Sequence, residues 1–299
     1  MGALKFSWES IDGGYWNMKK ALIVGLRSEK SGKTATATAL LDLLREAGAR
    51  ACGFKPRAGN NIWYDYDVIS AALREGRIYG LDAKLLRGFS AIKLQEEVIN
   101  PVHRLWTIQS CEEISIPSKL PCFILDRISI VDRAPKTFIL INDSLPSNAL
   151  GSEVLSELTE ALQKGGNIIY KVKSVAELKR ATKLYDYALS SAYRKILKEK
   201  IEYVIIESYS NVALPWENLG NIDLTLAVEP GRVAAYDPER YFKAVKLFPK
   251  AEIGTERVSG LLKPLATIRV PPLRSSELIG GLKEGLLTLF KKLKCAFLP

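Results

Sequence analysis

Short apolar runs alternate with amphipathic helical patterns along most of this 299-residue chain. Residues 21–24 form an apolar run typical of a buried strand, and a helical pattern over 35–47 follows a polar loop. A second strand is predicted over 50–55 and is ended by Pro56. Because two strands joined through a helix usually pair in parallel, the chain is expected to open with a βαβ unit.

Similar patterns continue to the C-terminus. Residues 57–61 are predicted to form a loop, 97–102 an extended segment and 229–232 a turn. Further helices are predicted over 65–74, 82–87, 152–164, 174–198, from 237 onward and over 276–293, and strands over 167–172, 203–207, 222–228 and 266–270. The predicted fold class is therefore α/β, with a mostly parallel sheet flanked by helices.

Two parts of the chain depart from this alternation. Residues 1–17 are polar and aromatic without a clear period, and we interpret them as an N-terminal extension. The region of about 117–172 begins with short β-rich runs separated by turn residues, which predicts a β-rich insertion. The expected organisation is one domain over 18–299 that carries this insertion.

The polar loop after the first strand carries the clearest chemical motif. Residues 31–34 read Ser-Gly-Lys-Thr and lie between a predicted strand and a predicted helix, as in the phosphate-binding loop of P-loop nucleotidases. Backbone N–H groups and the helix dipole favour phosphate at such a helix start. The strict pattern requires glycine at position 27, but this chain has Arg27 there, and Gly25 comes two residues earlier.

This motif assigns specific roles to its residues. Lys33 is expected to reach the β and γ phosphates of a nucleotide, and the hydroxyl of Thr34 is expected to bind Mg²⁺. The residues expected to contact the nucleotide are Glu29, Lys30, Ser31, Gly32, Lys33, Thr34 and Ala35.

Other charged residues follow predicted strands and are expected at the same edge of the sheet. Ligands of such sheets bind at the carboxyl ends of the strands, where Lys55 ends the second strand. Glu207 ends the apolar strand predicted over 203–207 and is the preferred acidic ligand of Mg²⁺. Asp143, at the end of another apolar run, is the alternative ligand. Asp67 follows the Lys55 loop and is a further candidate, although a carboxylate in a first helical turn often only complements the dipole.

The composition narrows the partners. Hydrophobic residues make up 47% of the chain and charged residues 25%, which is typical of a globular protein. The net charge of +10 suits an anionic partner, but the basic residues are spread out and not interleaved with aromatic residues, so no specific nucleic acid is expected. The sequence contains neither a membrane-spanning apolar run nor a signal-peptide pattern.

Cysteine and histidine usage gives little support for a metal site of the zinc type. The four cysteines contain no C-x-x-C pair, and His103 is the single histidine of the chain. We therefore expect the cysteines to be reduced packing residues of a cytoplasmic protein.

Taken in order, several motifs resemble those of the dethiobiotin synthetases and, more broadly, of their relatives in cobyrinic acid a,c-diamide synthesis. The motifs are residues 24–34 with the phosphate loop, 53–56 (Gly-Phe-Lys-Pro), Asp67, 99–101 (Ile-Asn-Pro) and 204–207 (Val-Ile-Ile-Glu). The resemblance implies the fold of P-loop nucleoside triphosphate hydrolases, with ATP and Mg²⁺ bound. It also implies that Asp67 and Glu207 complete the metal site with Thr34, and that Lys55 stabilises the transferred phosphoryl group.

The chain also departs from this family. Residues 208–211 (Ser-Tyr-Ser-Asn) replace its glycine-rich loop, and Gly59 replaces a serine. The expected function is an ATP-dependent ligase that activates a carboxylate or carbamate of a small-molecule substrate for C–N bond formation. The alternative is a nucleotide-dependent switch that acts on a partner or a membrane surface through the basic helix 276–293, although we expect the apolar residues of that helix to pack on the sheet. A homodimer is compatible with the sequence.

Overall fold

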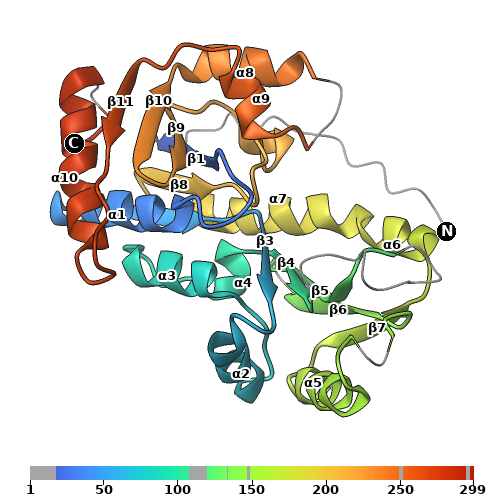
Figure 1. Ribbon diagram of the computed structural model, residues 1–299. Coiled ribbons are helices and arrows are strands. Elements are labelled where there is room, and N and C mark those ends of the chain that lie inside the picture. The colour runs from blue at the N-terminus through green and yellow to red at the C-terminus, as the bar shows by residue number, and fades with distance from the viewer. Residues whose placement is uncertain (1–17, 108–119, 133, 147–148, 249–251, 294–296) are drawn as a thin grey trace.

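The computed structural model describes residues 18–107, 120–132, 134–146, 149–248, 252–293 and 297–299. Within these residues the chain is a mixed α/β structure, with two mixed sheets flanked by helices (Figure 1). The extension predicted over 1–17 lies outside the described residues. No helix in the described part is long and apolar enough to cross a membrane.

The first sheet contains the strand that precedes the phosphate-loop motif. In the described residues its order is β11 (Ala266–Arg269), β10 (Arg232–Tyr236), β9 (Leu224–Glu229), β1 (Lys19–Gly25), β8 (Tyr203–Glu207) and β2 (Ala51–Phe54). The strands β2, β8, β1 and β9 are parallel, whereas β10 and β11 are antiparallel to their neighbours. All of β2 and β8 is buried, which explains their nearly continuous apolar sequences.

A second sheet lies beside the first. Its order in the described residues is β3 (Arg57–Asn61), β4 (Val102–Trp106), β5 (Phe123–Ile130), β6 (Lys136–Asn142) and β7 (Ile168–Val172). The pairs β3–β4 and β6–β7 are parallel, and the pairs β4–β5 and β5–β6 are antiparallel. The prediction of one mostly parallel sheet is therefore wrong. The described residues of 117–172 supply β5, β6 and β7.

Helices cover both sheets. Their bounds are α1 (Lys33–Glu46), α2 (Tyr66–Arg74), α3 (Leu81–Phe89), α4 (Glu96–Ile99), α5 (Ser152–Lys164), α6 (Val175–Ala181), α7 (Lys183–Leu197), α8 (Pro238–Lys246), α9 (Thr255–Ser259) and α10 (Leu278–Leu293), with a 3₁₀ turn at Glu217–Leu219. Helix α1 packs on β1, β2 and β8 and touches α3 and α10. Helix α7 runs between the two sheets (Figure 1).

Several predicted elements differ from the structure for local reasons. The polar segment Arg57–Asn61 was expected to be a loop but forms β3, because it pairs in parallel with β4. The single helix predicted over 174–198 is divided at Thr182 into α6 and α7. The extended segment predicted over 97–102 contains α4 before the chain enters β4.

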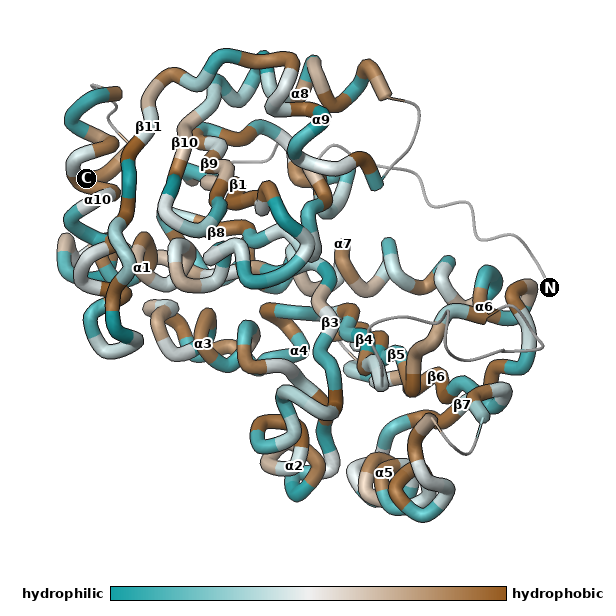
Figure 2. The backbone as a smooth tube through the Cα atoms, viewed as in Figure 1, coloured by the Kyte–Doolittle hydropathy of each residue, from teal (hydrophilic) through white to brown (hydrophobic). Residues whose placement is uncertain are grey.

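Hydrophobic residues are concentrated on the inner strands of the sheets, whereas the helices carry both hydrophobic and hydrophilic residues (Figure 2). A large core lies around the first sheet, and a smaller one lies between the second sheet and helices α2 and α5. In α10 the buried residues are Leu282, Leu286, Leu289 and Phe290. Since α10 contacts α1 and β11, the expected packing of its apolar face is confirmed.

The second sheet contains a buried ion pair that also contacts α7. Arg104 donates two hydrogen bonds of 2.6 Å to the carboxylate of Asp126, which is fully buried. The hydroxyl of Tyr185 donates to the same carboxylate over 2.5 Å. Because Tyr185 belongs to α7, this polar group fixes the helix against the sheet.

The described cysteines differ from each other. Cys52 is a buried free thiol, and burial raises its pKa to about 12. Cys122 is disulfide-bonded, so the expectation that the cysteines are reduced is wrong for this residue.

His103 predicts a pH dependence of stability. The imidazole is fully buried, and burial and the charge of Arg127 lower its pKa from 6.5 to about 3. As the pH falls below 6.5, His103 is protonated in the unfolded chain but stays neutral in the folded chain. The free energy of unfolding is therefore at its full value above pH 6.5 and decreases toward pH 3. We expect a loss of about 2 kcal/mol between pH 7 and pH 5 that is absent from the pH dependence of His103→Leu. Urea unfolding at several pH values measures it.

NMR gives a second readout of the same prediction. Because the chain has one histidine, its imidazole resonance is assigned without ambiguity. The resonance should not titrate between pH 7 and pH 4.5 in the folded protein. A midpoint near pH 6.5 would contradict the prediction.

Candidate active site at the carboxyl ends of β1, β2 and β8

The loop between β1 and α1 presents the start of a helix. Gly32 stands at the N-cap with φ 93°, in the left-handed region that favours glycine, and no side chain of the described residues caps the helix. The first backbone N–H groups of α1 therefore have no acceptor within the helix. They form a place where an anion is stabilised by hydrogen bonds and by the helix dipole.

Gly25 lies under the side chains of the loop that follows β1. A Cβ atom at Gly25 would lie 2.7 Å from both Lys33 Nζ and Ser31 Oγ. The side chain of Lys33 folds back over the end of β1, and only a residue without a side chain leaves room for it. A larger residue at position 25 would displace Lys33 and Ser31 and crowd the carbonyl of Arg27, which would lie 3.0 Å from the added Cβ atom.

Lys33 is buried and held by neutral acceptors. Its ammonium donates to the carbonyl of Ser210 over 2.7 Å and to Ser31 Oγ over 3.0 Å. Burial and the charge of Lys55 lower its pKa to about 8. Added negative charge at this position would therefore be favourable.

Strand pairing brings Glu207 to this loop. Strand β8 lies directly beside β1, with Glu207 level with Ile23, and Ser208 N donates to Ile23 O over 2.9 Å. The hydroxyl of Thr34 lies 2.8 Å from Glu207 Oε1. Two residues that are distant in the sequence are thus in contact at the carboxyl ends of adjacent parallel strands.

Strand β2 brings Lys55 to the same place. Phe54 is paired with Ile206, so Lys55 follows level with Glu207, and its ammonium donates to Glu207 Oε1 over 2.6 Å. Lys55 also contacts the carboxylate of Asp82. Burial lowers the pKa of Lys55, but the two carboxylates outweigh this effect and raise it. Lys55 is therefore a fixed positive charge.

Asp82 is the residue that the sequence prediction missed. It lies in the first turn of α3, and its Oδ1 is 3.0 Å from the hydroxyl of Thr34. Burial raises its pKa, but Lys55 and Thr34 outweigh this and keep it below the usual value. Helix α3 reaches this position because Gly53 faces it, where a Cβ atom would lie 2.9 Å from Leu86 Cβ. A glycine in a strand facing a helix was the available signal.

The structure does not bring the other two carboxylate candidates to this group. Asp67 is exposed in the first turn of α2, which packs on the second sheet, and within the described structure it forms no hydrogen bond or ion pair with Thr34 or Lys55. Asp143 follows β6 in the second sheet, where it pairs with Lys171 and Lys173. Of the predicted carboxylates, the described structure therefore places only Glu207 beside Thr34.

The hydroxyl of Thr34 faces two carboxylates but has a single proton to donate. A hydroxyl donates one hydrogen bond, yet Thr34 Oγ1 lies within 3.0 Å of oxygen atoms of both Asp82 and Glu207. The other oxygen of Glu207, Oε2, is buried without a hydrogen-bond partner among the described residues. Burial raises the pKa of Glu207, although Lys55 opposes this effect. This set of hard oxygen ligands fits a small cation such as Mg²⁺.

The protein alone offers few ligands to such an ion. Within the described residues, no group of three or more His, Cys, Asp and Glu side chains is arranged to hold a metal. Mg²⁺ usually retains several waters and takes one or two carboxylates together with substrate phosphates. Thr34, Asp82 and Glu207 match that incomplete set.

The backbone of Lys55 is fixed by the segment that precedes β4. Lys55 N donates to Ile99 O over 2.7 Å, and Asn100 Nδ2 donates to Lys55 O over 2.9 Å. Asn100 is itself fully buried and accepts hydrogen bonds from Arg127. Residues of the motif 99–101 therefore hold the backbone of Lys55, which belongs to the motif 53–56.

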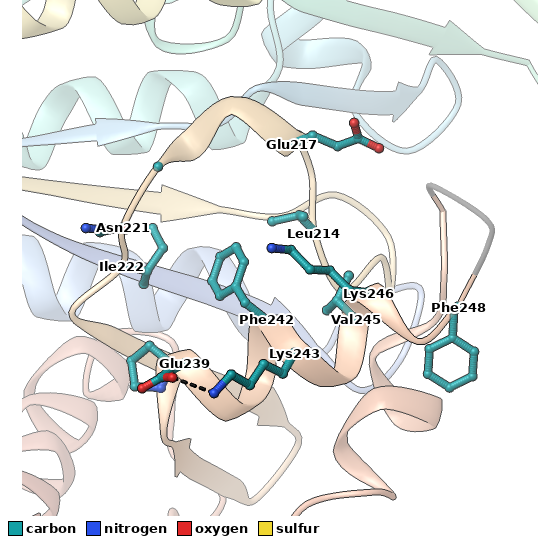
Figure 3. A pocket seen from close by; sticks show the side chains of 12 residues that line it. Leu214, Glu217, Asn221, Ile222, Glu239, Phe242, Lys243, Val245, Lys246 and Phe248 are labelled. Carbon is teal, nitrogen blue, oxygen red and sulfur yellow. Dashed lines mark hydrogen bonds and ion pairs between the residues drawn. The ribbon is translucent and has the colours of Figure 1, made fainter. Parts of the chain in front are cut away.

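A cavity of about 830 Å³ lies elsewhere on the first sheet. It is lined by α8 and by residues that precede β9, and Phe242 lies between Ile222 and Leu214 (Figure 3). Lys243 at its edge is paired with Glu239 at 2.5 Å. The cavity faces the amino end of β9, so it is separate from the group around Thr34.

The sequence matches no protein-family model and has no significant match among curated proteins.

Lys55, Asp82 and Glu207 form an ion cluster, which predicts a specific pattern of stability changes. Lys55→Met leaves two carboxylates, of which Glu207 is fully buried, without their cation, so the free energy of unfolding should fall by about 3 kcal/mol. The double variant Lys55→Met/Glu207→Gln should regain part of that loss, because it also removes a buried charge. Lys84→Met, on the exposed side of α3, is the matched control and should change stability by less than about 0.5 kcal/mol. Denaturant unfolding compares the variants, and equal stability of the two Lys55 variants would contradict this account.

Proposed function

We propose that this protein is a P-loop nucleotide-binding protein that uses ATP and Mg²⁺. The observation that carries the proposal is the convergence of Lys33, Thr34, Lys55, Asp82 and Glu207 at the uncapped start of α1. The first N–H groups of α1 and Lys33 provide donors and positive charge for phosphates. Glu207, on the strand adjacent to β1, provides the acidic partner that such sites place beside the Ser or Thr of the loop.

Within this class, we propose an ATP-dependent ligase similar to dethiobiotin synthetases. The γ-phosphoryl group of ATP would pass to an oxygen of a carboxylate or carbamate, ADP would leave, and an amine would then displace phosphate to form the C–N bond. Lys55 supports this assignment because it is a preorganised positive charge held at the carboxyl end of β2. The small-molecule substrate would enter on the side of Lys55.

The chain's own residues have distinct tasks in this proposal. Lys33 would exchange the Ser210 carbonyl for phosphate oxygens, whose negative charge would offset the effect of burial on its pKa. Thr34, Asp82 and Glu207 would hold Mg²⁺, which supplies charge neutralisation to the phosphates. Asn100 would keep Lys55 level with Glu207, because its side chain binds the backbone carbonyl of Lys55. A residue in the place of Gly25 would block the return of Lys33.

The alternative proposal, a switch that acts through the basic C-terminal helix, has less support. Its effector surface would be the apolar face of α10, and the buried residues of that face pack within the protein. The loop of Ser210 contacts Lys33, as a nucleotide-sensing segment would, but a ligase requires the same contact to break. We therefore favour the ligase.

Removal of the Lys33 ammonium tests the class. We expect Lys33→Ala to have no detectable ATP turnover while remaining folded, because positive charge is lost where the transition state spreads negative charge over phosphate oxygens. Phosphate release and thermal unfolding are measured together, with Lys84→Ala as the control for a general charge effect. Wild-type turnover by a folded Lys33→Ala protein would end the P-loop proposal.

The metal site is tested by comparing four carboxylates. Asp82→Asn and Glu207→Gln should each lower the affinity for Mg²⁺ in the presence of nucleotide by at least about tenfold, because each removes an anionic ligand. Asp67→Asn and Asp143→Asn should match the wild type, since neither carboxylate contacts Thr34 in the described structure. Mg²⁺ titrations followed with a fluorescent ATP analogue give the four affinities. A large effect at Asp67 with none at Asp82 would reverse this assignment.

A further inference from the structure

A carboxylate is already bound close to the candidate active site. The carboxylate belongs to Glu252, and its Oε1 accepts a hydrogen bond of 2.7 Å from the hydroxyl of Tyr209. The same oxygen atom lies 3.2 Å from Arg57 Nη1. We call the pair Arg57 and Tyr209 the carboxylate clamp. The clamp joins a positive donor and a neutral donor on one carboxylate oxygen.

The clamp has donors that Glu252 does not use. A guanidinium carries five N–H groups in a planar fork that matches both oxygens of a carboxylate. The hydrogen bonds of Arg57 within the described residues involve Nη1, and its Nε is buried without a partner. A ligand carboxylate that approached freely could use more of the fork than the tethered side chain of Glu252 does.

Aromatic packing fixes the guanidinium. The Arg57 guanidinium carbon lies 5.4 Å from the ring centre of Tyr185 and 5.8 Å from that of Tyr209. Tyr185 is itself held by its hydrogen bond to the buried Asp126. Because the rings restrict the guanidinium before a ligand arrives, little conformational entropy is lost on binding.

The clamp lies beside the ion cluster through both of its residues. Arg57 comes two residues after Lys55, and Tyr209 comes two residues after Glu207. Two residues of extended chain span about 7 Å. The carbonyl of Ser210, next to Tyr209, accepts the hydrogen bond from Lys33. A molecule in the clamp would therefore be held by residues that adjoin in sequence the groups proposed to handle phosphate.

We propose that the carboxylate clamp binds a carboxylate group of the second substrate, and that Glu252 occupies it when that substrate is absent. The binding of a carboxylate is carried by the contacts of Glu252, whereas its assignment to a second substrate rests on the proposed ligase function. Glu252 can leave because its side chain is 61% exposed, and ion pairs at such sites contribute little stability. An incoming carboxylate replaces it at Arg57 and Tyr209 without leaving an unpaired buried charge.

The experiment uses acetate as the smallest carboxylate probe. Glu252→Ala removes the internal carboxylate, and thermal unfolding is measured against acetate at constant ionic strength in chloride. Saturating acetate should raise the Tm of Glu252→Ala by about 2 °C, because a ligand that binds the folded state stabilises it. The wild type should respond less, since Glu252 competes at a high effective concentration. Acetamide, which has the same shape without the charge, should have no effect on either protein.

Two further variants decide whether the clamp is the site. Arg57→Gln/Glu252→Ala should lose the acetate response, and Tyr209→Phe/Glu252→Ala, which retains the ring, should weaken it. Equal acetate responses in all these proteins, or no response in Glu252→Ala, would overturn the proposal. Nucleotide binding by the wild type is measured in parallel. Acetate binding at the clamp without nucleotide binding would remove its assignment to a ligase substrate.

Discussion

The buried ammonium of Lys55 is the constraint on which this structure depends most. A charge removed from water must be matched by opposite charge, and Lys55 is matched by Asp82 and Glu207. These residues come from the end of β2, the start of α3 and the end of β8, and both carboxylates approach Thr34 at the start of α1. One buried charge therefore fixes the relative positions of two strands and two helices. The same charge gathers the carboxylates and the hydroxyl to which the proposed catalytic function is assigned.

The second sheet supports this site. Strand β3 begins two residues after Lys55, so the chain passes from the ion cluster into the second sheet without a flexible connection. On its other side, Arg127 of β5 contacts Asn100, and Asn100 holds the backbone of Lys55. Burial lowers the pKa of Arg127 to about 10 although the charge of Glu97 opposes this, and Arg127 donates hydrogen bonds to Ser129 and Asn100. The second sheet thus positions the candidate site as well as adding a second core.

The electrostatics of the site favour an added anion in one part and an added cation in another. Among the described residues the ammonium of Lys33 has only neutral acceptors, and burial lowers its pKa, so a bound phosphate would stabilise its charge. Burial raises the pKa of Glu207, and its Oε2 has no hydrogen-bond partner within the described structure, so a bound cation would stabilise the carboxylates. A nucleotide with its metal ion brings both charges in one ligand. The nearby clamp of Arg57 and Tyr209 adds a third position that already holds a carboxylate.

The sequence by itself determined the elements whose signals are local. The apolar run before Glu207 predicted β8, Asp237 and Pro238 predicted the start of α8, and the glycine-lysine-threonine loop predicted the start of α1. These succeeded because burial on both faces, helix capping and backbone geometry leave a trace within a few residues. The contact between Thr34 and Glu207 followed from the rule that parallel strands present their carboxyl ends together.

Only the tertiary structure decided the rest. Asp67 and Asp82 both lie in the first turn of a short helix, and no local feature separates them. The choice of Asp82 depends on the close packing of α3 against Gly53, a contact between segments about 30 residues apart. Strand β3 likewise forms from a polar sequence because β4 supplies its hydrogen bonds. Pairing and close approach are properties of two segments at once, so neither segment alone encodes them.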